Sequence, residues 1–295
     1  MYHEPEHLPA DFAEAFARAG GRFGRLGSPI LFFSTLGSTN DVALTLAATG
    51  DGEGAVVIAD AQTAGRGRRG RGWFSPPASG LYVSLVVAPG RARLDPERAT
   101  ALLTLAAGVA LAEGVEAATG LRADIKWPND LLVARRKLAG ILAEAVVGDP
   151  PDRGGGGAPA AMGNRGAPRD AMNVVLGYGI NVGPMAYPPE LSDRATSLES
   201  ELGRPIDRAA LCAETLAAVA RRYDDLLEGR FDAILDAWRN RAPGCRDARV
   251  TWEATSGADA APRLGTTAGV DDWGALLVRV AGRVERIVAG ELTWL

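Results

Sequence analysis

The sequence predicts an α/β (α+β) protein in which a helix-covered mixed sheet is followed by a small all-β module. Apolar, β-prone runs at 31–36, 55–62, 80–89 and 172–183 predict buried strands. A long apolar stretch at 99–120 predicts one buried helix. The chain ends in short β-prone runs separated by glycine turns, which is typical of a small β module of about 50 residues.

The remaining patterns place further elements around these strands. Residues 10–20 and 41–49 have helical spacing, and residues 207–239 predict two more helices. Residues 123–147 predict a strand, a turn, a strand, a tight turn and a strand. This mixture of strands and helices is the basis of the α/β (α+β) assignment.

Composition divides the chain into parts. Residues 1–29 form an N-terminal extension, residues 30–240 the mixed-sheet domain and residues 241–295 the C-terminal module. Within the mixed-sheet domain, residues 148–172 are rich in glycine, proline, alanine and charge, so we expect a disordered insertion there.

The overall composition argues against several function classes. A net charge of -4 gives no global attraction to nucleic acid or to an anionic membrane. No apolar run approaches the roughly 18 residues that span a bilayer, and the acidic N-terminus lacks the pattern of a signal peptide. Two cysteines do not make a disulfide framework. We therefore expect a soluble, cytoplasmic protein with no nucleic-acid or membrane partner.

The scarce residue types are more informative. The two histidines, His3 and His7, lie in an N-terminal stretch that we expect to be frayed, so neither a histidine-based triad nor a histidine-ligated metal site is expected. Against thirty arginines the chain has two lysines, Lys126 and Lys137, and it has one glutamine, Gln62. A lysine kept in such a chain indicates a site that needs a compact ammonium rather than a planar guanidinium.

A loop rich in arginine and glycine follows the strand at 55–62. Residues 65–72 read Gly-Arg-Gly-Arg-Arg-Gly-Arg-Gly and are followed by Trp73. The glycines let backbone N–H groups approach a ligand, and the arginines offer forked donors to phosphate or carboxylate. A solvated basic loop and an RGG-like nucleic-acid segment are the alternatives. Because this loop is single and embedded between strands, we favour an anion-binding loop.

Both lysines lie in one predicted hairpin. Lys126-Trp-Pro-Asn-Asp130 leads into its first strand, Arg135 and Arg136 form its turn, and Lys137 starts the returning strand, Lys-Leu-Ala-Gly-Ile-Leu. Pro-Asn-Asp is also good turn chemistry, so a purely structural turn is the alternative. The presence of both lysines here favours a site.

Two weaker motifs complete the set. Gly177-Tyr-Gly-Ile-Asn-Val182 lets a strand backbone approach a ligand, or marks a bulge. Gly37-Ser-Thr-Asn40 precedes a predicted helix. One of its polar residues is expected to cap that helix, which leaves the others for a ligand.

In this order, STN, AQTAGRGRRGRGW, KWPND, KLAGIL and GYGINV resemble the catalytic domain of biotin protein ligases. The tail GVDDWGALLV…AGEL resembles the C-terminal SH3-like barrel of that family. The resemblance spans residues 30–295, and the ordered set is far more specific than any single motif. It implies a mixed-sheet catalytic domain of the biotin/lipoate ligase type, in a short form without the N-terminal DNA-binding domain that some relatives carry.

The resemblance implies that the enzyme makes biotinyl-5'-AMP from biotin and ATP, with Mg²⁺, and biotinylates a specific lysine of a biotin carboxyl carrier protein. Lys137 and Arg68 would be catalytic, and Asp130 would help Asn129 to organise the pocket. The residues implied to bind biotin are Ser38, Thr39, Asn40, Gln62, Gly65, Arg66, Gly67, Arg68, Lys137 and Gly140. The residues implied to bind ATP are Arg69, Arg71, Trp73, Lys126, Trp127, Asn129 and Asn181.

This reaction suits the residues. Attack of a carboxylate on a phosphate brings two anions together, so cations must offset their repulsion. No protein nucleophile is needed, which agrees with the scarcity of histidine. Since adenylates hydrolyse, we expect the arginine loop, whose arginines would lack ordered partners before ligand binds, to close over the intermediate with Trp73.

A lipoate or octanoate ligase or transferase on the related fold is the alternative. A covalent octanoyltransferase needs a cysteine, but Cys212 lies on a predicted core helix and Cys245 at the domain boundary. A nucleic-acid-binding regulator is opposed by the acidic net charge and by an N-terminal extension below the roughly 50 residues of a typical domain. An edge strand of either domain could support a homodimer, although the sequence selects none.

Overall fold

The computed structural model describes most of the chain. The described residues are 4–48, 52–146, 173–184, 187–189, 191–252, 262–290 and 292–295. The segment at 148–172, expected to be a disordered insertion, lies outside these residues, as does His3.

Seven strands of the described chain form one mixed sheet in the order β1-β2-β3-β7-β6-β5-β4. β1 and β2 are parallel, and all other neighbours in the sheet are antiparallel. Every strand lies where the sequence predicts one, so the α/β class is confirmed. The strands are β1 (Ile30–Leu36), β2 (Val56–Gln62), β3 (Gly80–Val87), β4 (Asp124–Lys126), β5 (Asp130–Val133), β6 (Arg136–Ala145) and β7 (Val174–Asn181).

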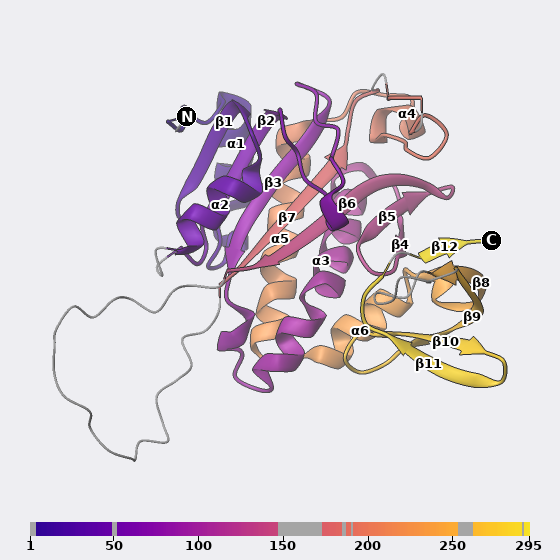
Figure 1. Cartoon of the computed structure of the whole chain (residues 1–295). Coiled ribbons are helices and arrows are strands. Elements are labelled where there is room, and N and C mark those ends of the chain that lie inside the picture. Colours follow the sequence, from indigo (N-terminus) through magenta and orange to yellow (C-terminus); the bar gives the residue numbers. More distant parts are fainter. Residues whose placement is uncertain are drawn as a thin grey trace, which may run out of the picture.

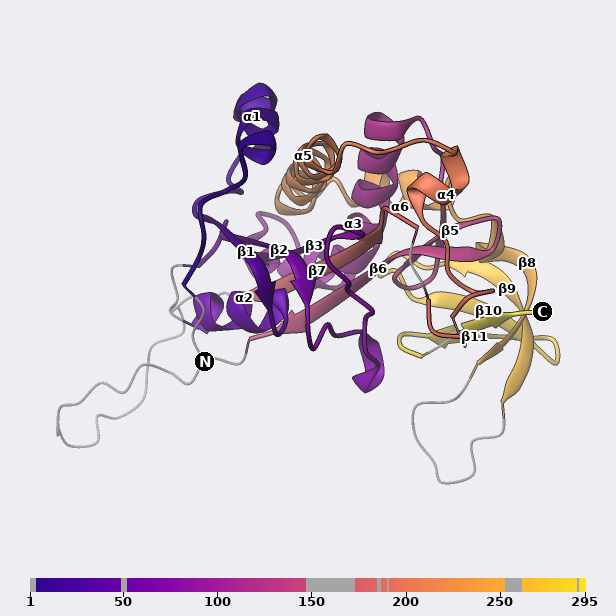
Figure 2. The same ribbon diagram turned by 90° about the horizontal axis from the view of Figure 1, so that it is seen from above.

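Helices cover both faces of this sheet. α1, α3 and α5 lie on one face and α2 lies on the other, as Figures 1 and 2 show. α6 packs against α3 and α5, and the short α4 is the one helix here that the sequence did not predict. The helices are α1 (Ala10–Ala19), α2 (Thr39–Ala48), α3 (Pro96–Thr119), α4 (Leu198–Leu202), α5 (Arg208–Leu227) and α6 (Phe231–Arg239).

α3 is the central helix of the core. Asp95 caps its start by accepting a hydrogen bond from the Arg98 N–H at 3.0 Å, and Gly120, in the left-handed region at φ 78°, ends it. Its length and hydropathy would suit a membrane span, contrary to our expectation that no segment reaches that length, but 67% of its most apolar window is buried in the protein. α3 is therefore placed as a core helix, with its apolar residues packed between the sheet and α5.

The N-terminal segment is packed against the core rather than frayed, so that part of our expectation is wrong. Glu6 Oε1 accepts hydrogen bonds from the N–H and the hydroxyl of Ser34 on β1. Phe12 and Phe16, one helical turn apart on α1, are buried with Phe23. The physical reason is the aromatic face of α1, which needs an apolar partner surface.

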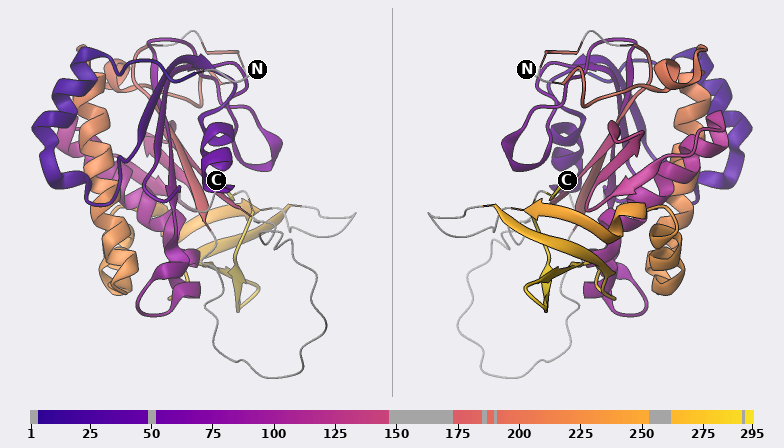
Figure 3. Two further views of the ribbon diagram at one scale, coloured as in Figure 1. Left: turned by 90° about the vertical axis from the view of Figure 1, so that its left-hand side faces the viewer. Right: turned by 90° about the vertical axis from the view of Figure 1, so that its right-hand side faces the viewer.

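The C-terminal module is a five-stranded antiparallel sheet within the described residues, in the order β11-β10-β9-β8-β12. It packs beside the β4 end of the large sheet (Figure 1), and Figure 3 shows the module, in orange and yellow, from two further sides. Among the hydrogen bonds between the mixed-sheet domain and residues 241–295, Trp127 Nε1 donates to the Gly274 carbonyl at 3.0 Å, and the Ile125 N–H donates to the Arg241 carbonyl at 2.6 Å. The strands are β8 (Arg246–Trp252), β9 (Arg263–Val270), β10 (Leu276–Val280), β11 (Arg283–Ile287) and β12 (Leu292–Trp294).

Candidate active site

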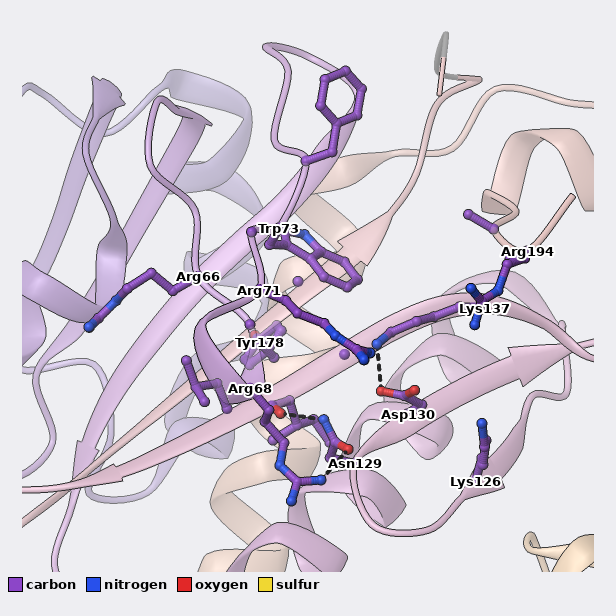
Figure 4. A pocket seen from close by; sticks show the side chains of 18 of the residues that line it. Arg66, Arg68, Arg71, Trp73, Lys126, Asn129, Asp130, Lys137, Tyr178 and Arg194 are labelled. Carbon is purple, nitrogen blue, oxygen red and sulfur yellow. Dashed lines mark hydrogen bonds and ion pairs between the residues drawn. The ribbon is translucent and has the colours of Figure 1, made fainter. Parts of the chain in front are cut away.

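A cavity of about 460 Å³ opens on the sheet where the arginine loop, the start of α2, β5, β6, β7 and β12 meet (Figure 4). Of the described residues that the sequence predicts for the site, all but Gly65 line it. The lining residues among them are Ser38, Thr39, Asn40, Gln62, Arg66, Gly67, Arg68, Arg69, Arg71, Trp73, Lys126, Trp127, Asn129, Lys137, Gly140 and Asn181. The fold thus gathers residues that are up to 143 positions apart in the sequence (Ser38 to Asn181).

Positive charge is concentrated on this wall. Among the described lining residues, eight are arginine or lysine and two, Asp130 and Asp193, are acidic. The whole chain, in contrast, has a net charge of -4. A local excess of cations in an acidic protein indicates that the cavity takes an anionic ligand. Arg135 and Arg194 are part of this excess and were not among the predicted site residues.

Gly65 lies behind the cavity wall. A Cβ on Gly65 would be 2.5 Å from the carbonyl oxygen of Trp73 and 2.6 Å from Ser75 Oγ. Its carbonyl accepts a hydrogen bond from the Trp73 N–H at 2.8 Å. The glycine is therefore required by the close packing at the base of the loop, rather than by a ligand that approaches its backbone.

One end of the cavity, which we call the amide end, consists of Thr39, Asn40 and Gln62. Gln62 Oε1 accepts hydrogen bonds from the N–H of Thr39 at 2.9 Å and from its hydroxyl at 3.2 Å. Gln62 Nε2 donates to Ser75 Oγ at 2.9 Å. Ser84 Oγ lies 2.7 Å from Thr39 Oγ1 and 2.6 Å from Asn40 Oδ1. These interlocked contacts fix the amide end in one arrangement.

Arg66 differs from our expectation. Its Nη2 lies 2.8 Å from Asp41 Oδ1 and 2.9 Å from Glu144 Oε2, so its guanidinium has ordered protein partners. Figure 4 shows the side chain of Arg66 pointing away from Arg71 and Lys137. The expectation that the arginines of the loop lack ordered partners is therefore wrong, because carboxylates of α2 and β6 lie beside the loop.

The arginine loop forms a small hairpin of its own. The Gly67 N–H donates to the Arg71 carbonyl at 2.7 Å, and Arg66 and Gly72 form a bridge. Arg69 adopts the left-handed region at φ 58°, which turns the chain at the tip. From this turn, Arg68 Nη1 donates to Asn129 Oδ1 at 3.0 Å.

Asn129 connects the loop to the sheet. While its Oδ1 accepts from Arg68, its Nδ2 donates to the Ile141 carbonyl on β6 at 2.9 Å. The two contacts use opposite ends of one amide and therefore define its orientation. This agrees with a residue that organises the pocket, whereas direct contact of Asn129 with ATP stays a prediction.

Trp73 lies over two glycines of the sheet. A Cβ at Gly140 would be 2.9 Å from the indole ring, and a Cβ at Gly179 would be 2.3 Å from Nε1 of Trp73. Lys137 Nζ lies 5.3 Å from the centroid of the same ring. The close glycines of β6 and β7 thus accommodate an aromatic side chain of the loop. This explains why the sequence has glycine at these two positions. The alternative interpretation of the Gly177–Val182 motif, a bulge, is wrong, because β7 pairs with β3 and β6 in regular register.

The other end of the cavity, which we call the lysine end, consists of Lys126, Asp130 and Lys137. Lys137 Nζ lies 2.7 Å from Asp130 Oδ1. Lys126 Nζ lies 5.9 Å from the ring centroid of Trp294, on the last strand of the chain. Figure 4 shows Arg71 and Lys137 pointing toward one another, so their charges converge on one part of the cavity.

The segment that follows β7 holds the backbone of Lys137. The Lys137 N–H donates to the Arg194 carbonyl at 2.7 Å, and the Lys137 carbonyl accepts from the Thr196 N–H at 2.9 Å. Asn181 Nδ2 donates to the Thr196 carbonyl at 3.0 Å. Asn181 therefore supports this segment as well as lining the cavity.

Trp127 has a structural contact that the sequence did not predict. Its side chain is 5% exposed, and its indole N–H is bonded to Gly274 of the C-terminal module. Trp127 lines the cavity but belongs mainly to the core between the two sheets. The tryptophan of the KWPND motif thus fixes the turn that carries Lys126 and Asp130.

Besides Arg135, sequence reasoning missed Glu144, Arg194 and Trp294, which lie at or beside the site. Glu144 contacts the amide end, whereas Arg194 and Trp294 line the cavity. For Glu144 the available signal was a lone carboxylate two residues beyond the apolar motif Lys-Leu-Ala-Gly-Ile-Leu. Arg194 and Trp294 lie outside any motif, so only the fold brings them to the cavity.

Neither cysteine lies in surroundings that suit a covalent nucleophile. Cys212 is fully buried in α5, and burial raises the pKa of its thiol well above the ordinary value. Cys245 is 7% exposed, and burial raises its thiol pKa too. Because the thiolate is the nucleophilic form, neither cysteine suits the covalent octanoyltransferase alternative.

The comparisons with known proteins agree with the geometry. The family model described as biotin/lipoate A/B protein ligase family matches residues 33–154. The chain is 33% identical over 286 residues to the bifunctional ligase/repressor BirA of Bacillus subtilis, an alignment that covers 96% of this chain and 79% of the relative. It is 34% identical over 273 residues to the biotin–(acetyl-CoA-carboxylase) ligase of Mycobacterium tuberculosis, covering 88% of this chain and 86% of the relative.

The chain belongs to the biotin protein ligase family. The solved biotin protein ligase of Aquifex aeolicus in complex with biotin and ATP matches with a TM-score of 0.70 at 24% identity, covering 90% of this chain and 98% of that one. The ligase of Leishmania major in complex with biotinyl-5-AMP matches with a TM-score of 0.56 at 24% identity, covering 88% and 98%. These likenesses confirm the predicted fold. The two relatives at 33% and 34% identity confirm the predicted family and ligase class.

Proposed function

We propose that this ligase forms biotinyl-5'-AMP from biotin and ATP and then biotinylates a lysine of a carrier protein. A carboxylate oxygen of biotin attacks the α-phosphorus of ATP, the bond to the bridging oxygen breaks, and pyrophosphate leaves. The neutral amine of the carrier lysine then attacks the acyl carbon, AMP leaves, and the new amide loses a proton. The single observation that carries this proposal is the gathering of the amide end and the lysine end in one cavity.

The amide end suits a neutral polar head such as the ureido ring of biotin. Thr39, Asn40 and Gln62 offer hydroxyl and amide groups that can both donate and accept, and their mutual contacts hold them in place. A pre-organised set of such groups selects its ligand, because a ligand without matching groups leaves buried polar atoms without partners.

The lysine end suits the reacting anions. Lys137 would lie between the biotin carboxylate and the α-phosphate, with Arg71 reaching toward the same place. Such cations offset the repulsion between the two anions and stabilise charge on the phosphoryl oxygens. Arg69 and Lys126 would contact the remaining phosphates, and Asn181 the adenine.

Mg²⁺ would accompany ATP. The described residues contain no group of three or more metal-ligating side chains, so the protein does not offer a complete cage. Mg²⁺ commonly keeps several waters and binds through one or two carboxylates together with substrate phosphates. Asp130 is a carboxylate of the lysine end and fits that arrangement. The ion would neutralise phosphate charge.

The carrier would be a biotin carboxyl carrier domain of a biotin-dependent carboxylase, and the reaction would take place in the cytoplasm. The named relative from Mycobacterium tuberculosis is a ligase of acetyl-CoA carboxylase. That name supports a carboxylase as the acceptor.

The experiment is to incubate the ligase with ATP and Mg²⁺ and with biotin, lipoate or octanoate in parallel. Of the three acids, we expect only biotin to give pyrophosphate release and an acyl-adenylate. Biotin should then be transferred when a carrier domain is added. Formation of a lipoyl- or octanoyl-adenylate at a comparable rate would overturn the assignment of biotin. Lys137→Ala provides the inactive control.

A further inference from the structure

Glu144 of β6 joins the two structures that border the amide end. Its Oε2 accepts hydrogen bonds from Asn40 Nδ2 at 2.6 Å and from Arg66 Nη2 at 2.9 Å. Asn40 is at the start of α2, and Arg66 is at the base of the arginine loop. One carboxylate therefore connects β6, α2 and the loop. Although Glu144 is among the described residues, it is not part of the cavity wall.

The contact with Glu144 fixes the orientation of the Asn40 amide. Asn40 is 4% exposed, and its Oδ1 lies 2.6 Å from Ser84 Oγ on the side opposite Glu144. There is no room to shift toward β7, since a Cβ at Gly177 would lie only 2.0 Å from Asn40 Oδ1. With donor and acceptor ends both engaged, Asn40 presents one defined surface to the cavity.

The contact with Arg66 fixes the base of the loop. Arg66 bridges to Gly72 on the opposite arm of the loop, so both arms are held where Glu144 and Asp41 bind the guanidinium. The tip, with Arg68, is attached separately through Asn129. Movement of the tip would therefore leave the base in place.

The geometry points to Glu144 as a positioning residue for biotin. We propose that it holds Asn40 and the base of the arginine loop in the arrangement that binds biotin before any ligand arrives, without contacting biotin or ATP itself. This inference rests on the proposed function. It predicts that loss of Glu144 weakens biotin binding and retention of the adenylate, and leaves ATP binding nearly unchanged.

Two substitutions separate the contributions. Glu144→Gln keeps an oxygen that can accept from Asn40 but removes the charge that binds Arg66, whereas Glu144→Ala removes both contacts. We expect KM for biotin to rise about tenfold in the alanine variant and by a smaller factor in the glutamine variant. KM for ATP and kcat at saturating biotin should stay within about twofold of the parent.

Glu285→Gln is the matched control. Glu285 also pairs with an arginine of another element, Arg263, and its side chain is 34% exposed against 28% for Glu144. It lies in the C-terminal module, away from the amide end, so biotin binding should be unchanged. The apparent melting temperature of all three variants reports whether they fold.

Biotin affinity measured by calorimetry without ATP decides the question. Weaker binding in both Glu144 variants, with ATP parameters preserved, supports the inference. Biotin affinity equal to that of the parent in a folded Glu144→Gln and Glu144→Ala pair would overturn it, as would an equal rise of KM for biotin and ATP. If the parent ligase binds no biotin at all, the proposed function fails instead, so the two failures are distinguishable.

Discussion

The amide end and the lysine end of the cavity are organised differently. At the amide end, Thr39, Asn40 and Gln62 bond mainly to one another and to residues of the sheet and loop. At the lysine end, Lys137 forms an ion pair with one carboxylate, Asp130, and faces a wall rich in cations. Polar groups that are satisfied by the protein are pre-formed for a neutral ligand. A wall with more cations than carboxylates among its described residues instead attracts an anionic ligand.

This difference predicts which step each end controls. Interactions that are already made in the free protein select and hold the substrate, whereas cations aimed at developing charge lower the barrier of the chemical step. Substitutions at the lysine end should therefore reduce kcat or raise KM for ATP, and substitutions at the amide end should raise KM for biotin. Four predictions follow from the comparison, in order of decreasing effect.

The largest effect is expected from Lys137→Ala. Removing the ammonium leaves the biotin carboxylate and the α-phosphate without the charge between them, so adenylate formation should fall by about a hundredfold or more. Lys137→Arg should restore activity only in part, because a planar fork cannot replace a compact ammonium next to Asp130. Pyrophosphate release measures the step. Near-normal pyrophosphate release by the alanine variant would show that Lys137 does not act in the chemical step. It would also contradict the proposed difference between the two ends of the cavity.

The second prediction concerns Arg68→Gly, which cuts the bond from the loop tip to Asn129. The base of the loop stays attached through Arg66, so the adenylate should still form at a rate within a few-fold of the parent, but it should escape about tenfold faster. Escaped biotinyl-adenylate labels lysines of bystander proteins. The ligase has only two lysines of its own, so self-labelling stays low.

The measurement is a biotin blot after each enzyme is mixed with biotin, ATP and a lysine-rich protein that is not a carrier. More bystander labelling by the variant supports a retaining role of the loop tip. If the variant holds the adenylate as long as the parent does, retention depends on the base of the loop or on Trp73.

Much of the fold was readable from the sequence because its signals are local. The strands and helices follow from apolar periodicity, although α3 begins at Pro96, three residues before the predicted start. The packing of the N-terminal segment was not predicted. Its partner is a surface formed by distant residues, and no local pattern reports that surface.

The candidate site was predicted as a set of residues but not as a set of contacts. The motifs named many of the lining residues, but they included Gly65, which does not line the cavity, and omitted Arg194 and Trp294. They could not show that Arg66 pairs with Asp41 and Glu144, since that depends on how β6 lies against the loop. Likewise, Trp294 reaches the lysine end only because β12 pairs with β8 at the boundary of the two sheets.

The third prediction concerns Trp294→Leu and a moderate effect at the lysine end. The substitution removes the aromatic face near Lys126, a contact of the kind that contributes about 0.5–2 kcal/mol. KM for ATP should rise by about three- to tenfold, while KM for biotin stays unchanged. Trp273→Leu is the matched control, because Trp273 is a tryptophan of the same module that is 41% exposed. A rise of KM for biotin with no change in KM for ATP would contradict the assignment of Trp294 to the lysine end.

The smallest effect is expected from deleting residues 152–169, which lie outside the described chain. The ends of the excursion are neighbours: β6 and β7 pair as far as Ala145 and Val174, and the Val146 N–H donates to the Asn173 carbonyl at 2.9 Å. The eight residues left between 146 and 173 are more than a hairpin loop of about 2–5 residues needs. Activity should therefore stay within about threefold of the parent.

This deletion also tests the comparison, because the described residues that flank the excursion, Val146 and Asn173, lie close to Glu144 and hence nearer the amide end. Should steady-state kinetics show any change, we expect it in KM for biotin rather than in KM for ATP or kcat. A large loss of kcat in a variant with an unchanged melting temperature would contradict this. It would show that the segment acts on the chemical step or on the carrier, which the hydrogen-bonded closure of β6 and β7 does not require.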